Sequence, residues 1–264
     1  MRTEISLISE TNISYAWAKA FLAVMDRGVQ ELGPLVVRVS LDDNLPLESV
    51  GVRQAFDASL SRLRAAHGKL QTVNTVANTI FPNSLWNPNV DCRKLFVRFD
   101  KAWPRIKKCA QNRRGSYFFR MTNFRGTEEG KPINQLEHII STYNSGNHRR
   151  SALIATIFDP ALDHKNNRQL GFPCLQQVSF SPDGNGGLVV SGTYTTQYLF
   201  DRAYGNYLGL CRLGEFMAKE MGLKLVQMNC IALVGQRGTP SKSELKPLVE
   251  QLRSEMAQAE GTAA

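Results

Sequence analysis

The sequence predicts an α+β protein in which a mixed β-sheet is layered with helices. Helical patterns and short β-branched runs follow one another without the regular alternation of a doubly wound fold. Hydrophobic residues make up 42% of the 264 residues and charged residues 21%, a composition that can build a core and excludes a disordered or low-complexity chain. Because one large domain fits this length, we expect a single domain over residues 1–264.

The N-terminal part mixes helical and strand patterns. Apolar residues at helical spacing after Ser14 predict a helix from the mid-teens to Glu31, where a Gly-Pro pair would end it. Residues 35–39 form a β-branched run typical of a strand, and residues 52–63 repeat the helical pattern. Prolines predict short elements and loops over residues 82–104.

The middle of the chain predicts a helix, a buried strand and a hairpin. Apolar residues recur at helical spacing over residues 133–143, and residues 151–158 form an almost continuous apolar run. Residues 178–190 alternate apolar and polar side chains around a Pro-Asp-Gly-Asn-Gly-Gly turn, which is a strong hairpin signal.

The C-terminal part predicts a helix, a strand and a second helix. The helical pattern of residues 206–221 ends at Gly222, and residues 223–234 form an apolar strand. Ser241 and Glu244 have the spacing of a capping box, which predicts a last helix that runs to about Met256 and then frays.

Net charge favours anionic partners. Lys and Arg number 32 against 23 Asp and Glu, a formal charge of +9, which attracts phosphates, nucleotides or nucleic acid.

A basic cluster follows the proline-containing segment, and because no aromatic platform or known motif accompanies it, we interpret it as a solvated helix face. A phosphate backbone is the alternative partner. The cluster consists of Arg105, Lys107, Lys108, Arg113 and Arg114.

Several classes of protein are not indicated. The five cysteines form no C-x-x-C pair and the four histidines no H-E-x-x-H motif, so we expect neither a metal site nor a disulfide framework. No apolar stretch approaches the ~18 residues of a membrane span, and the N-terminus lacks a cleavable leader pattern. We therefore expect a cytoplasmic protein with no membrane partner.

Four short motifs follow one another in a definite order. They are an Asn-Gln-Leu helix start at 134–136, an Arg-Arg pair at 149–150, a Phe-Pro-Cys hairpin start at 172–174 and a Tyr-Gly-Asn helix start at 204–206. This order resembles the thymidylate synthase family, in which D-Q-I, S-R-R, P-C-H and P-F-N motifs succeed one another. The resemblance covers roughly residues 12–255 and implies a thymidylate-synthase-like fold.

The resemblance implies roles for individual residues. Cys174 takes the position of the thiolate that attacks C6 of a pyrimidine nucleotide, an addition that makes C5 electron-rich. Arg149 and Arg150 take the position of a phosphate clamp that reaches the active site of the other subunit, which implies a homodimer. Asn206 matches the amide that reads the pyrimidine edge, and Gln135 matches a residue without a catalytic role.

Other family residues are replaced. Thr195 stands where the family has an arginine that binds phosphate and activates the thiol, and Leu175 replaces the histidine after the nucleophile. Tyr198 replaces the aspartate that orients folate, and the closing tail is absent. The resemblance implies a folate cofactor, but these two differences argue against folate binding. The cations that could substitute for the lost arginine are Arg202, Arg212 and Arg237.

Three functions stay open at this point. We expect a thymidylate-synthase-like transferase that binds a pyrimidine nucleotide or related phosphate compound, with Cys174 as covalent nucleophile but without ordinary folate-dependent methylation of deoxyuridylate. The alternative is a dimer on the same fold that binds a nucleotide or a protein without chemistry. Nucleic-acid binding through the positive surface needs only charge. Each residue also has a structural interpretation: Cys174 as a small buried side chain, Arg149 and Arg150 as solvated residues, and Asn206 as a polar helix start.

Overall fold

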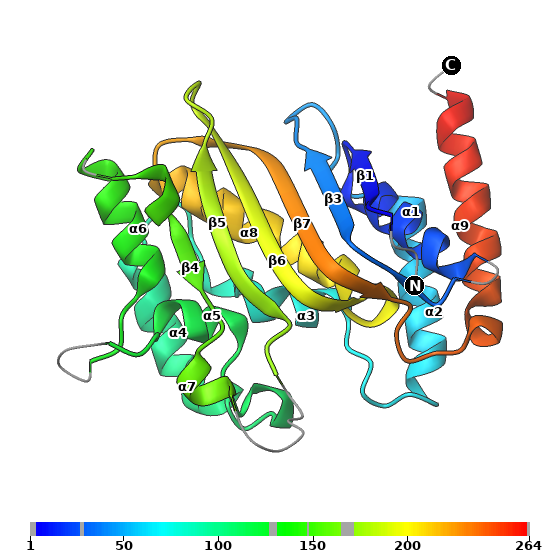
Figure 1. The fold of residues 1–264 in the computed structure, drawn as a ribbon, viewed down its shortest axis with the longest axis horizontal. Helices are drawn as coiled ribbons and strands as arrows, with labels where there is room; N and C mark the ends of the chain where they lie inside the picture. Colours follow the sequence, from blue (N-terminus) through cyan, green and yellow to red (C-terminus); the bar gives the residue numbers. More distant parts are fainter. Residues whose placement is uncertain (1–3, 27–28, 127–130, 147, 165–171, 263–264) are drawn as a thin grey trace. The chain divides into compact units, whose positions relative to one another are not determined.

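The computed structural model describes residues 4–26, 29–126, 131–146, 148–164 and 172–262. It is an α+β protein with a mixed sheet and helices layered on it, as the sequence predicts (Figure 1). The chain divides into two compact units. The first consists of Met1–Val76, Tyr194–Leu208 and Gln227–Ala264, and the second of Ala77–Thr193 and Gly209–Val226.

Strands of both orientations meet in the first unit. β1 (Ser6–Glu10) is parallel to β3 (Leu35–Ser40), and β3 is antiparallel to β7 (Lys224–Gln236), with Val37 opposite Cys230. The short β2 (Glu31–Leu32) also pairs with β7, and β6 (Gly187–Tyr198) is the next strand in the order. The predicted strands over 35–39 and 223–234 are therefore confirmed.

Helix α1 (Ile13–Met25) packs on the buried face of these strands. Two more helices, α2 (Val50–Arg64) and α9 (Lys242–Thr262), pack against α1 and against each other. Trp17 of α1 is fully buried, and its indole nitrogen donates to the Leu199 carbonyl at 2.7 Å. Its ring also packs edge-on against Phe56 of α2, at 4.7 Å between centroids.

Two predicted helix ends in this unit are wrong. α1 stops at Met25 because Asp26 leaves the helical conformation at ψ 152°, so the Gly-Pro pair lies beyond the end that we predicted at Glu31. α9 continues to Thr262 and does not fray after Met256. The predicted capping box at its start is confirmed, because the Ser241 N–H donates to Glu244 Oε2 at 2.8 Å and Ser241 Oγ accepts from the Glu244 N–H at 3.3 Å.

The second unit contains the predicted hairpin. β5 (Leu175–Pro182) and β6 are neighbours, and Asp183 Oδ1 accepts from the N–H groups of Asn185 and Gly187 at 2.7 and 2.8 Å in the turn between them. α8 (Tyr204–Glu220) follows β6 and ends before Gly222, whose φ is +66°, as the sequence predicts. Two helices, α8 and α3 (Val73–Ile80), begin in the first unit and end in the second. The other elements of the second unit are α4 (Arg93–Ile106), α5 (Tyr117–Thr122), α6 (Gln135–Asn144), β4 (Ile154–Thr156) and α7 (Pro160–Asp163).

Two predictions in this unit are corrected. The segment predicted as loops contains α4. Pro104 lies in the last turn of this helix, so the hydrogen bond that it removes interrupts little of the helix. Leu95, Phe96 and Phe99 are buried at helical spacing and hold the helix in the core. The strand predicted over 151–158 is only β4, since Arg150–Ala152 form a 3-10 turn.

Side chains at the start of α6 complete β4. The Gln135 side chain donates to the Thr156 carbonyl and accepts from the Thr156 N–H, each at 2.8 Å. β4 is the last strand in the sheet order, and this amide satisfies backbone groups that an edge strand otherwise leaves unpaired. Gln135 therefore has a structural role at this edge of the sheet.

Candidate functional site

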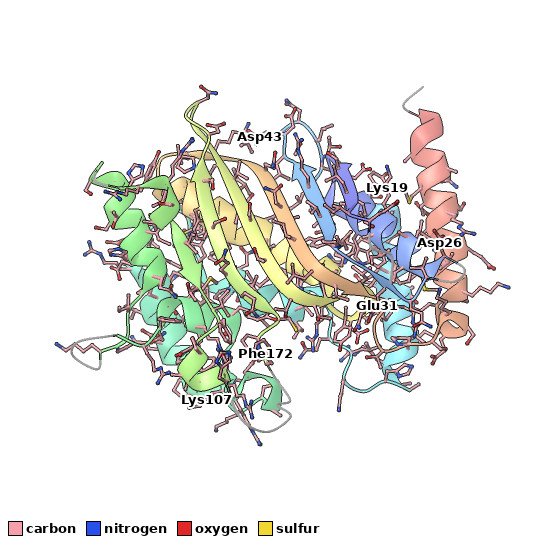
Figure 2. All side chains as sticks on the ribbon, in the orientation of Figure 1. Lys19, Asp26, Glu31, Asp43, Lys107 and Phe172 are labelled. Atoms are coloured by element: carbon pink, nitrogen blue, oxygen red, sulfur yellow. The ribbon has the colours of Figure 1, made fainter. Side chains whose placement is uncertain are left out.

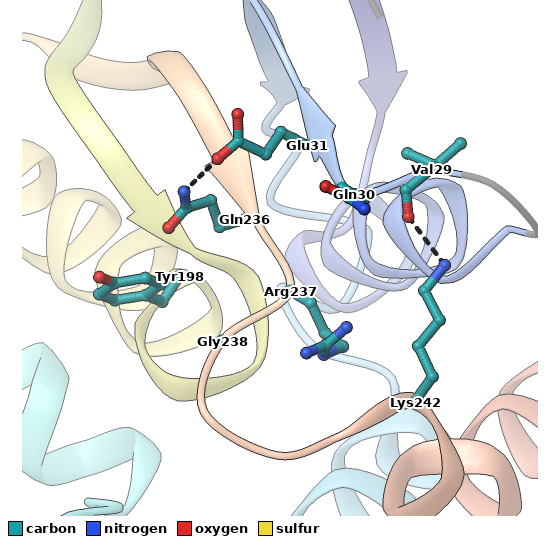
Figure 3. Close-up of a pocket in the computed structure, with 8 residues that line it drawn as sticks. All are labelled: Val29, Gln30, Glu31, Tyr198, Gln236, Arg237, Gly238 and Lys242. Atoms are coloured by element: carbon teal, nitrogen blue, oxygen red, sulfur yellow. Dashed lines mark hydrogen bonds between the residues drawn. The ribbon is translucent and has the colours of Figure 1, made fainter. Parts of the chain in front are cut away.

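An open pocket of about 610 Å³ lies in the first unit (Figure 3). This volume is typical of sites for small molecules. Residues from four separate parts of the chain line it: Val29, Gln30, Glu31, Tyr198, Gln236, Arg237, Gly238 and Lys242.

Lys242 brings one positive charge to the pocket. It is the first residue of α9, and its ammonium donates to the carbonyls of Asp26 and Val29 at 2.6 and 2.8 Å. These bonds fix the ammonium beside the chain that follows α1. Because both acceptors are neutral, and because no carboxylate of the described residues lies within ion-pair distance of Lys242, its charge is not neutralised.

Arg237 brings a second positive charge directly after β7. Its Nε donates to the Pro240 carbonyl at 2.7 Å, which fixes the plane of the guanidinium. The terminal Nη groups have no hydrogen-bond partner among the residues that the structure describes. A guanidinium that is oriented at one edge and open at the other suits bidentate binding of a phosphate or carboxylate.

The loop that follows Arg237 is held by an aspartate. Asp201, in the π-helix Leu199–Ala203 after β6, accepts the backbone N–H of Thr239 at 3.0 Å and also the Thr239 hydroxyl. Gly238 has a φ of +116°, and a Cβ atom there would overlap Asp201 Oδ1 and lie 3.1 Å from its Cγ. Only glycine fits this position without displacing Asp201.

The remaining wall offers hydrogen-bonding groups and an aromatic ring. The Gln236 amide donates to Glu31 Oε1, and Figure 3 shows this pair apart from the Lys242 ammonium. The Tyr198 ring is 43% exposed at the end of β6. The pocket thus combines a cationic part, a carboxylate–amide pair and a ring on which a planar group can stack.

The second unit holds three of the residues predicted from the resemblance. Cys174 is a half-buried residue directly before β5 and forms no disulfide, while Arg149 and Arg150 are exposed before β4. The Arg150 guanidinium donates to the carbonyl of Pro182, at the other end of β5 from Cys174. Eight residues of strand at ~3.3 Å each separate those ends by ~26 Å, so the structure does not bring Arg150 and Cys174 of one chain together.

Asn206 belongs to the first unit. It lies in the first turn of α8, is 4% exposed, and does not line the pocket. Of the three arginines considered as substitutes for the lost cation, Arg237 lines the pocket, Arg202 donates to the Gln71 side chain, and Arg212 lies in the part of α8 that belongs to the second unit.

The other cysteines have structural surroundings. None of the five cysteines, all of which lie among the described residues, forms a disulfide. Burial, followed by the nearby charges of Glu220 and Asp91, raises the pKa of Cys92 to about 11, and burial raises the pKa of Cys230 to about 12. Both are therefore protonated at neutral pH and unsuited to nucleophilic attack.

Neither a metal centre nor a membrane span is found in the part of the chain that the structure describes. No group of three His, Cys, Asp or Glu side chains there could hold a metal ion. None of its helices is both long and apolar enough to cross a bilayer. No family model matches the chain, and no curated protein matches its sequence.

The sequence singled out two of the pocket residues: Tyr198 as a departure from the family's pattern, and Arg237 as one of three cations that could substitute for the lost arginine. Glu31, Gln236 and Lys242 carried no motif. The one signal for them is the Arg-Gly-Thr-Pro loop after a long strand, a place where ligand-binding residues are common.

Proposed function

We propose that this pocket binds a pyrimidine nucleotide or a related phosphate compound, in a thymidylate-synthase-like protein. The observation that carries the proposal is the pair of cations, Arg237 and Lys242, without a carboxylate partner among the described residues and in one pocket with a half-exposed ring. A phosphate would accept from the open edge of Arg237 and receive a further charge from Lys242.

The rest of the pocket suits a base better than a second phosphate. The Glu31 carboxylate can accept a ring N–H, and the Gln236 amide can both donate and accept, which are the groups that a pyrimidine edge requires. The Tyr198 ring offers a face for stacking. A carboxylate at this wall would repel a second anionic group, so the pocket favours a monophosphate.

Calorimetry with nucleotide and nucleoside tests the assignment. We expect deoxyuridylate to bind and deoxyuridine to bind much more weakly. Arg237→Gln should weaken nucleotide binding by about 10- to 100-fold, the value of a hydrogen bond to a charged group. Arg253→Gln removes an exposed cation of α9 that is not part of the pocket, and this control should bind like the parent. No binding at millimolar nucleotide would contradict the proposal.

We also propose a homodimer formed through the sheet face that α1, α2 and α9 leave open. In the first unit, Met228 and Cys230 of β7 are buried, whereas Leu233 and Leu7, which point the other way, are 53% and 68% exposed. A second copy would cover these leucines. It would also give the exposed Arg149 the cross-subunit role that the family resemblance implies. A monomer in light scattering at micromolar concentration would contradict this part.

Catalysis at Cys174 is a separate, enzymatic proposal, because Cys174 belongs to the second unit and does not line this pocket. The Cys174 side chain is half-buried directly before β5 and forms no disulfide, as is usual for cysteines in a reducing cytoplasm. Iodoacetamide should alkylate Cys174 of the parent, and saturating deoxyuridylate should slow the reaction. Cys174→Ser identifies the modified residue by mass. Equal alkylation with and without ligand would favour the alternative, a dimer that binds nucleotide without covalent chemistry.

A further inference from the structure

Most of the net charge lies in one short segment of the second unit. Residues 91–114 contain nine Lys and Arg against two Asp, a formal +7 of the chain's +9. The segment comprises α4 and the turns after it, and its cationic side chains are exposed. Figure 2 shows Lys107 on the outside of this unit, beyond the end of α4.

Four of these cations form a line along α4. Lys94, Arg98, Lys101 and Arg105 are spaced by four, three and four residues, so they lie within about 60° of one another around the helix axis and extend over ~16 Å. The opposite face carries the buried apolar residues of the helix. A cationic ridge of this kind is rigid, because the helix beneath it packs in the core.

The charge of the segment is mostly unpaired. Arg93 lies 3.7 Å from Glu137 and Arg98 donates to the Leu85 carbonyl. The side chains of the other seven cations form no ion pair or hydrogen bond with any residue that the structure describes. These seven are Lys94, Lys101, Arg105, Lys107, Lys108, Arg113 and Arg114. Unpaired like charges repel one another, so a surface of this kind gains free energy from a polyanion.

An aromatic pair lies on the other side of α4 from the line of cations. Trp103 of α4 stacks on Phe119 of α5, with 4.0 Å between centroids and 14° between planes, and both rings are half-buried. Trp103 follows Lys94 by nine residues, about 180° around the helix axis, and its ring lies 5.8 Å from that of Phe99 on the buried face. The aromatic pair is therefore not part of the line of cations, and it is the unpaired charges that favour a polyanion.

We propose that the cationic ridge, defined as α4 together with residues 107–114, binds the phosphate backbone of a nucleic acid. An anionic membrane fits less well. A helix that lies in a membrane interface needs several exposed apolar anchors, whereas α4, all of which the structure describes, has one exposed large hydrophobic side chain, Val97. The ridge is separate from the pocket, which belongs to the other unit, so this function does not depend on nucleotide binding there.

Fluorescence anisotropy with a labelled 20-nucleotide single-stranded DNA and a 20-base-pair duplex tests the ridge. If five of the seven unpaired cations contact phosphates, raising the salt from 50 to 200 mM weakens binding by about 100-fold for the single strand and about 500-fold for the duplex. Binding that does not depend on salt would overturn the proposal.

Two triple variants with the same net charge separate the ridge from a general charge effect. Lys94→Gln, Lys101→Gln and Arg105→Gln together should lower the salt slope by about 2 for the single strand and weaken binding at least 10-fold at 50 mM. The control changes Arg64, Lys69 and Lys246 to Gln, three exposed cations of the first unit, and should stay within about twofold of the parent.

Equal losses in both triple variants would overturn the assignment to the ridge. So would binding to phosphatidylserine vesicles or to polyglutamate in place of both nucleic acids. Far-UV circular dichroism establishes that each variant is folded, which we expect because all six side chains are exposed.

Discussion

Replacing Gly238 by alanine tests how the pocket loop is built. At φ +116° an alanine carries a backbone penalty of ~1–2 kcal/mol, and its Cβ would displace Asp201. That displacement breaks the two hydrogen bonds from Thr239, and bonds to a charged group contribute ~1.5 kcal/mol when they are exposed. We therefore expect Gly238→Ala to lower the free energy of unfolding by about 4–5 kcal/mol.

Gly184→Ala is the matched control for this change. Gly184 also has a positive φ, +88°, but no atom lies within 4 Å of the position that its Cβ would take. Only the backbone penalty remains, so we expect a loss of about 1 kcal/mol. Urea denaturation of the two variants, compared at equal m-values, gives the difference.

The clash also predicts coupling between Gly238 and Asp201. Asp201→Ala alone removes the two hydrogen bonds from Thr239. The double variant loses the same two bonds only once, and the alanine at position 238 no longer overlaps the Asp201 carboxylate. The cost of the double variant should therefore be at least ~1 kcal/mol below the sum of the two single costs. Equal costs for Gly238→Ala and Gly184→Ala, or strict additivity with Asp201→Ala, would refute the reasoning.

Three further predictions concern other parts of the chain. Hydrogen bonds from Ser241, and then from His67, hold the pKa of Glu244 at about 2, below its unfolded value, so its stabilising contribution is complete above about pH 5 and is lost as the pH falls toward 2. Glu244→Gln should flatten the fall in Tm across that window, and an unchanged slope would contradict this. Asp163→Ala should lower the free energy of unfolding by about 3–5 kcal/mol in urea, because it leaves Arg120 buried without the carboxylate that it binds at 2.6 and 2.9 Å, and a cost below 1 kcal/mol would contradict this. The parent should form no dihydrofolate from deoxyuridylate and methylenetetrahydrofolate, whereas turnover abolished by Cys174→Ser would show the opposite.

Elements with local signals were predictable from the sequence. The capping box at Ser241 and the Gly-rich turn after Pro182 involve residues within a few positions of one another, so their hydrogen bonds follow from the order of side chains. The first helix was predicted too long because its apolar spacing extends to Val29, although the backbone leaves the helix at Asp26. The sequence does not predict α4, because the destabilisation by Pro104 depends on its position in the helix. That position is set by where the helix starts and ends, which in turn follows from the burial of its apolar face.

The pocket was much less predictable than the fold. Its residues come from four segments spread over residues 29–242, and only the pairing of β2 with β7 brings Glu31 opposite Gln236. No local pattern encodes that meeting. The family resemblance identified Cys174 and the Arg pair as candidates. For this pocket it gave only the replaced aspartate at Tyr198 and Arg237 as a substitute cation.

The most direct test of the central claim is a crystal structure of the protein with deoxyuridylate at a concentration that saturates the calorimetric signal. We predict density for the phosphate within hydrogen-bond distance of the Arg237 Nη atoms and near the Lys242 ammonium, with the pyrimidine ring against Tyr198. An empty pocket, with the nucleotide bound elsewhere in the molecule, would contradict the account.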